Sequence, residues 1–130
     1  MKFSPIVPPR VFTVGFDQKI ELKDCARVGL EPDEQVTFVT ESGAEYDVAR
    51  KSWGFYATPS TNGRLKRFNL RAVLVRNRIN QYFVMLVEGG KEPLFQDYVV
   101  GERLAVLCWL DDPDDLARLE RTLGDGAHER

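Results

Sequence analysis

Short segments of alternating apolar and polar residues, separated by turn residues, constrain the fold of this chain most strongly. Residues 19–28 carry four apolar side chains on one parity, with mainly charged side chains on the other: Ile20, Leu22, Ala26 and Val28. This period of two predicts a strand with one buried and one solvated face. Because no helical pattern separates the strands, short turns favour an antiparallel fold over an alternating α/β one.

Five further segments are predicted strands: residues 35–40, 44–50, 65–75, 81–87 and 103–110. The first two form a hairpin around Ser42 and Gly43. The alternation then changes phase between Val48 and Trp53, which is typical of a β-bulge. The last two segments are apolar on both parities, so we expect central strands covered on both faces.

One helix is predicted near the C-terminus. Asp112 suits the N-cap, and Pro113 suits the first helical position. Three leucines then form an apolar stripe, and Gly124 ends the helix: Leu116, Leu119 and Leu123. Residues 94–100 fit either a strand or a short helix.

These elements predict a mainly β fold: an antiparallel sandwich or partly closed barrel of six to eight strands with one C-terminal α-helix. A single domain is expected over residues 11–124. Residues 1–10 contain three prolines and predict an extended N-terminal arm. Residues 125–130 predict a disordered tail.

The composition indicates a cytoplasmic protein. No apolar run approaches the ~20 residues of a membrane span, and the first ten residues lack the apolar core of a secretory signal. The two cysteines, Cys25 and Cys108, form no CxxC pair, which points to a reducing compartment.

Charge is strongly segregated along the chain. Residues 48–87 contain eight Arg and Lys but no Asp or Glu, while all 20 acidic residues and the other ten basic residues lie outside this window. The net charge of −2 therefore hides a basic centre and acidic flanks. If these bases share a surface, that surface attracts anions.

The candidate binding site lies within this window. On a continuous strand, Arg67, Asn69 and Arg71 would stand in one row, where arginine forks suit phosphate or carboxylate groups. Other residues would steer the anion, stack on it or complete a polar rim: Arg64, Lys66, Trp53, Tyr56 and Asn62. The alternative is that the arginines pair with acids of neighbouring strands and the aromatic residues are core.

The sequence provides no catalytic, metal or cofactor motif, so the prediction for each is none. The single histidine, His128, lies in the expected tail, which leaves nucleophilic triads without an imidazole. The acidic run from Asp111 to Asp115 lacks the ligand spacing of a calcium loop. Nucleic-acid binding ranks low because the pI is about 5.5 and no recognition motif occurs.

The working hypothesis is a non-catalytic cytoplasmic module that binds an anionic small molecule, such as a phosphorylated or nucleotide-linked sugar. A protein–protein accessory subunit or homodimer, with an acidic partner surface and no small-molecule site, is the second hypothesis. A small enzyme that uses carboxylates and tyrosine on an anionic sugar is the third, and a single-stranded nucleic-acid binder ranks below these. No membrane partner is expected.

Overall fold

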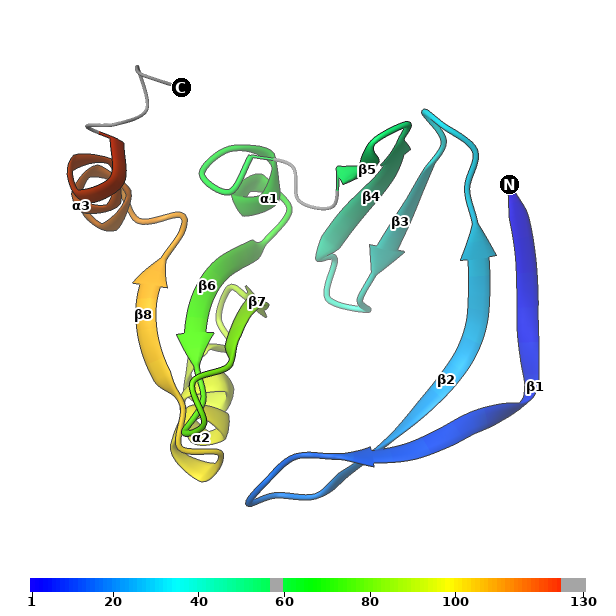
Figure 1. The fold of residues 1–130 in the computed structure, drawn as a ribbon, viewed down its shortest axis with the longest axis horizontal. Coiled ribbons are helices and arrows are strands. Elements are labelled where there is room, and N and C mark those ends of the chain that lie inside the picture. Colours follow the sequence, from blue (N-terminus) through cyan, green and yellow to red (C-terminus); the bar gives the residue numbers. More distant parts are fainter. Residues whose placement is uncertain (57–59, 125–130) are drawn as a thin grey trace.

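The computed structural model describes residues 1–56 and 60–124. The elements are β1 (Lys2–Val14), β2 (Ile20–Gly29), β3 (Gln35–Val39), β4 (Glu45–Lys51), β5 (Gly54–Tyr56), α1 (Arg64–Arg67), β6 (Leu70–Arg76), β7 (Tyr82–Glu88), α2 (Glu92–Gly101), β8 (Ala105–Trp109) and α3 (Pro113–Leu123). The strands form three antiparallel sheets, ordered β1-β2, β3-β4-β5 and β7-β6-β8 (Figure 1). The prediction of a mainly β, antiparallel fold with a C-terminal helix is confirmed.

The main core lies on the two faces of β6. Val73 and Val75 are fully buried on one face, where Phe95 of α2 and Trp109 of β8 pack edge to face. Leu70 and Ala72 face the other way, toward Leu65 of α1 and Tyr46 of β4. The central, doubly covered strand is therefore β6.

This arrangement corrects the prediction for residues 81–87. β7 is an edge strand, and its residues Tyr82, Phe83 and Val84 are exposed despite their apolar character. β8 lies at the opposite edge of the same sheet. Apolar residues at both odd and even positions therefore did not identify the central strand. The reason is that β7 has apolar side chains that no described residue covers.

The second sheet contains the predicted hairpin of β3 and β4, with Phe38 paired to Tyr46. The predicted β-bulge near residue 50 is instead a tight turn: Lys51 pairs with Gly54, and Ser52 and Trp53 lie between them. Gly54 has φ 146°, a conformation that glycine adopts at little cost. The turn changes the alternation phase as a bulge would.

Residues 2–10 are extended, and they belong to the 13-residue strand β1, which pairs with β2. The resulting hairpin is long and two-stranded. It runs beside the β3–β4 sheet at one end and reaches the region of α2 at its turn (Figure 1). The register shifts between Pro5 and Arg10, which lets residues of opposite parity in β1 share one face.

Neighbouring residues explain where the two longer helices, α2 and α3, begin. In α3, the Asp112 side chain accepts hydrogen bonds from the Asp114 and Asp115 N–H groups, and Gly124 is the C-cap, as predicted. Residues 94–100, which the sequence left open, belong to α2, with proline in its first turn. The expected tail at residues 125–130 lies outside the described residues.

Candidate functional site

The predicted basic row does not form on one strand. Arg67 ends the four-residue helix α1, Asn69 has φ 66° in the connecting turn, and only Arg71 lies on a strand, β6. The prediction of one long strand over residues 65–75 is therefore wrong at its first five residues. Asn tolerates the left-handed conformation that joins helix to strand here.

Arg71 is held by acids of other elements. Its Nε and Nη2 donate to the two carboxylate oxygens of Asp111 at 2.9 and 3.3 Å. Its Nη1 lies 3.6 Å from Glu92, and its guanidinium stacks 4.2 Å from the centre of the Trp109 ring. Asp111 is only 2% exposed, so this pair links β6 to the start of α3 within the protein.

Arg64 is also paired. Its Nε donates to Asp47 of β4 at 2.6 Å, and its guanidinium lies 4.4 Å from the Phe68 ring centre. Asp47 is buried and also accepts from the Thr37 hydroxyl. Arg64 in the first place, and Thr37 in addition, hold the pKa of the Asp47 carboxyl below its usual value.

Other bases of the acid-free window find partners in the acidic flanks. Lys51 bonds Asp33 at 2.5 Å, and Arg78 lies 3.5 Å from Asp17. Arg50 donates to the Leu30 carbonyl oxygen. Folding therefore brings together charges that are separate in the sequence. Many of the basic residues predicted to form one positive surface are instead paired with acidic residues of the same chain.

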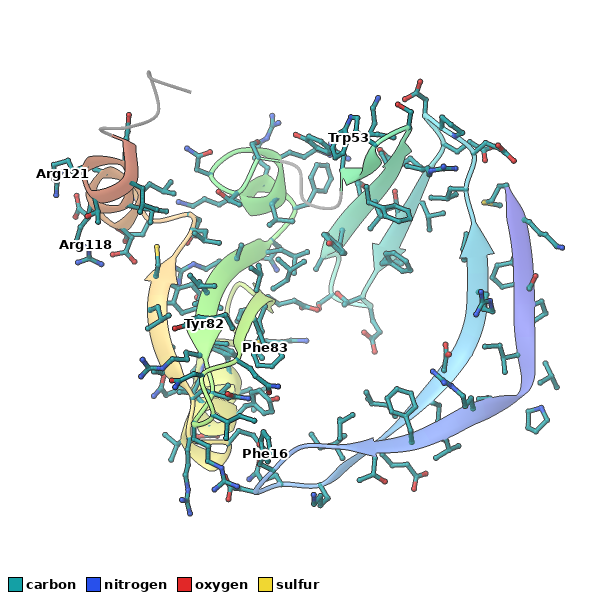
Figure 2. The ribbon with its side chains drawn as sticks, in the orientation of Figure 1. Phe16, Trp53, Tyr82, Phe83, Arg118 and Arg121 are labelled. Carbon is teal, nitrogen blue, oxygen red and sulfur yellow. The ribbon has the colours of Figure 1, made fainter. Side chains whose placement is uncertain are left out.

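The remaining candidate residues lie on the surface. Lys66, Arg67, Asn62 and Asn69 are exposed. Lys66 and Arg67 form no ion pair with any residue in the described part of the chain. Trp53 is 71% exposed at its turn (Figure 2) and Tyr56 is 50% exposed, so neither is core.

The β1–β2 hairpin carries an exposed apolar surface. The pairs Phe3–Val28, Phe12–Leu22 and Val14–Ile20 are directly opposite each other, so all six side chains share one face. We call this set the inner face: Phe3, Phe12, Val14, Ile20, Leu22 and Val28. Each of its members is between 37% and 60% exposed, although the alternation of β2 predicts burial.

The inner face is turned toward the other two sheets (Figure 1), and two pockets are lined by residues from both sides. One groove of about 590 Å³ is lined by Phe3 and Val28 together with Val36 and Phe38 of β3. A second cavity, of about 330 Å³, is lined by Val14 and Phe16 together with Phe83 and Met85 of β7. Figure 2 shows Phe16 at the hairpin turn and Phe83 on β7. The apolar lining therefore continues from the hairpin onto β3 and β7.

The hairpin turn is fastened to the end of α2 by Glu102. This carboxylate, 4% exposed, accepts hydrogen bonds from the N–H groups of Phe16 and Gln18 at 3.0 and 2.7 Å. Those bonds, from Gln18 first, lower the pKa of Glu102. Gly101 permits the approach, since a Cβ there would lie 2.7 Å from the Gln18 side chain. At the other end, the N-terminal ammonium pairs with Glu34 at 2.8 Å.

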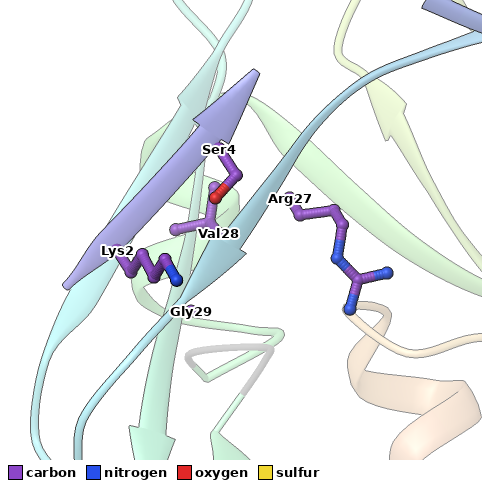
Figure 3. Close-up of a pocket in the computed structure, with 5 residues that line it drawn as sticks. All are labelled: Lys2, Ser4, Arg27, Val28 and Gly29. Atoms are coloured by element: carbon purple, nitrogen blue, oxygen red, sulfur yellow. The ribbon is translucent and has the colours of Figure 1, made fainter. Parts of the chain in front are cut away.

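The opposite, outer face of the hairpin is mainly polar, although it includes the exposed Val11. A hollow of about 430 Å³ beside it is lined by the outer-face residues Lys2, Ser4, Arg27 and Gly29 and also by Val28 of the inner face (Figure 3). Arg27 extends away from Lys2 in this view, so the two cations do not converge on a common point. The hairpin is thus amphipathic, with its apolar face turned toward the interior space.

The acidic run at residues 111–115 has structural roles. Asp111 binds Arg71, Asp112 caps α3, and Asp115 accepts from the Trp109 N–H group at 2.8 Å. Within residues 1–56 and 60–124, no three metal-ligating side chains cluster. No helix in the same ranges has the length and apolar character needed to span a membrane.

Comparisons with known proteins give no family, curated relative or solved structure that this chain matches. The inner face was not predicted as a site, because the alternation of β2 is also that of a strand with an ordinary buried face. Phe3 and Phe12 pair with apolar residues of β2, which could have indicated a shared apolar face. Because Phe3 and Phe12 have opposite parity in β1, however, they share that face only through the register shift in β1.

Proposed function

We propose that this chain is a non-catalytic assembly module, in which the inner face of the β1–β2 hairpin docks a protein surface. The single observation that supports this proposal most is the exposure of six aligned apolar side chains on one fastened hairpin. Contiguous apolar patches of this kind mark interaction sites in soluble proteins. The proposal keeps the accessory-subunit hypothesis but moves the docking surface from the basic window to the hairpin.

The fastened ends support a docking role. A two-stranded hairpin alone is marginally stable in water. Here Glu102 holds its turn, and an exposed ion pair with Glu34 adds a weaker contact at its start, so the turn end of the inner face is held in position before any partner arrives. A preorganised surface lowers the entropic cost of binding.

The enzyme hypothesis gains less support. It predicts a carboxyl group whose pKa is raised within a pocket. The described carboxyl groups with shifted pKa values are instead shifted down by hydrogen bonds and ion pairs: Glu34, Asp47, Glu88, Glu92 and Glu102. Such groups stay ionised at neutral pH and serve as acceptors.

The test uses Leu22→Asp, with Glu21→Gln on the outer face of the same strand as the matched control. Molar mass and the fluorescence of an apolar dye are measured for each. The proposal expects either an assembly that Leu22→Asp dissociates or a monomer that binds the dye through Leu22. A monomer that binds no dye, or an assembly indifferent to Leu22→Asp, would contradict it.

Anion binding remains a second candidate because Lys66 and Arg67 are exposed and unpaired among the described residues, and Trp53 and Tyr56 offer exposed rings. Its ligand class stays a phosphorylated or nucleotide-linked sugar. A thermal-shift titration with sugar phosphates should show stabilisation that the Lys66→Ala/Arg67→Ala variant loses. No shift in the wild-type chain would end this candidate.

A further inference from the structure

We propose that the partner is a second copy of this chain, in a two-fold dimer whose hairpins pack inner face against inner face. This inference rests on the proposed function and adds the identity of the partner. Because a two-fold contact uses the same patch on both copies, the patch must complement itself in shape, polarity and charge.

The exposed area matches what a dimer of this size requires. The chain exposes 9362 Å², whereas a compact monomer of its 14.9 kDa mass exposes about 7,000 Å². The excess is about 2,300 Å². If the nine residues outside the described ranges had the area of an unfolded chain, about 1,300 Å² of excess would still remain.

Two copies would therefore have about 2,600 to 4,600 Å² of excess area to bury between them. Interfaces of permanent homodimers bury roughly 2,000 to 5,000 Å² and are apolar, like a domain core cut in half. The groove beside Val36 and the cavity beside Phe83 provide space for side chains from the second hairpin. A short apolar peptide would cover only part of this surface.

The charges on the inner face are self-complementary. Arg10 and Asp24 are directly opposite each other in the register, midway along the hairpin, on the same face as Phe12 and Leu22. Their side chains lie 3.3 Å apart and are 70% and 34% exposed. A two-fold axis near this pair places Arg10 of one copy opposite Asp24 of the other, and the reverse contact forms by symmetry.

The outer face does not offer the same match. Its side chains include Lys2, Lys23 and Arg27 against a single acid, Glu21. Two such faces brought together would repel each other. The polarity of the hairpin thus selects the inner face as the surface that a second copy covers.

The first test is sedimentation equilibrium of the full chain. The wild-type mass should be twice 14.9 kDa. Phe12→Asp places a charge in the apolar contact and should raise the dissociation constant about 100-fold. Val11→Asp, on the outer face opposite Lys23, is the matched control and should stay dimeric. Circular dichroism of each variant verifies that it is folded.

The second test uses charge reversal on separate chains. Arg10→Asp and Asp24→Arg each place like charges together and should each weaken the homodimer at least about tenfold. An equimolar mixture restores opposite charges across the interface in both contacts, so heterodimer should form with an affinity near that of the wild type. If Arg10 and Asp24 act only within one chain, mixing restores nothing.

The outcomes separate the two proposals. A wild-type monomer at all concentrations that still binds apolar dye through Leu22 overturns the homodimer and leaves the assembly module with a different partner. A dimer that neither Phe12→Asp nor the charge reversals weaken has its interface elsewhere, which overturns both. A monomer without dye binding also overturns both.

Discussion

Replacement of Arg71 by alanine should destabilise the fold, although the sequence suggests that this residue binds a ligand. The guanidinium makes two hydrogen bonds to Asp111, lies near Glu92 and stacks on Trp109. Asp111 is 2% exposed, so removal of its partner leaves a buried carboxylate uncompensated. Loss of one member of a buried pair costs about 3 to 5 kcal/mol.

The lower end of that range applies because the Arg71 side chain is 30% exposed and water can reach part of the site. We therefore expect a loss of about 3 kcal/mol in the free energy of unfolding, or roughly 10 °C in the melting temperature. Urea unfolding followed by circular dichroism measures it.

The matched control is Arg67→Ala, four residues earlier, which should change the free energy of unfolding by less than about 0.5 kcal/mol. A double-mutant cycle with Asp111→Ala should return a coupling of about 1 to 3 kcal/mol. Equal stabilities for Arg71→Ala and Arg67→Ala would refute the structural role of the pair and return Arg71 to the list of ligand residues.

Three further predictions concern single carboxylates. Glu102→Gln should accelerate hydrogen exchange of the hairpin-turn amides while β6 amides stay protected, as NMR can detect; unchanged turn amides would contradict the fastening role. Because the folded pKa of Asp47 is lowered, its stabilisation is complete above the unfolded pKa of about 4 and is lost as pH falls through the folded value, so Asp47→Asn should flatten the acid limb of a stability–pH curve; an unaltered limb would argue otherwise. Asp112→Ala should cost about 1 kcal/mol in urea unfolding, since it removes the α3 N-cap, and no loss would mean that the cap is dispensable.

Local patterns predicted the elements whose causes are local. The cap of α3 and the β3–β4 hairpin are encoded by neighbouring residues, and both are present. The helix at residues 64–67 was missed because Phe68 has the same parity as Leu70 and Leu74, and only the conformation of Asn69 separates helix from strand.

Ion pairing and burial were harder to predict because the residues that pair or pack together lie far apart in the sequence. Arg71 and Asp111 are 40 residues apart, and Arg78 meets Asp17 across 61 residues. Only the topology brings such pairs together, so the acid-free window overstates the free positive charge. In the same way, the apolar parity of β2 predicted a buried face, but the described residues of this chain leave that face exposed.

The central claim is that a second chain covers the hairpin. Hydrogen–deuterium exchange of the wild type and Phe12→Asp, measured at equal concentration, tests it most directly. If a second chain covers the hairpin, amides of β1 and β2 are protected in the wild type and exchange faster in the variant, while those of β6 do not change. Equal exchange of β1 and β2 in both proteins would contradict it.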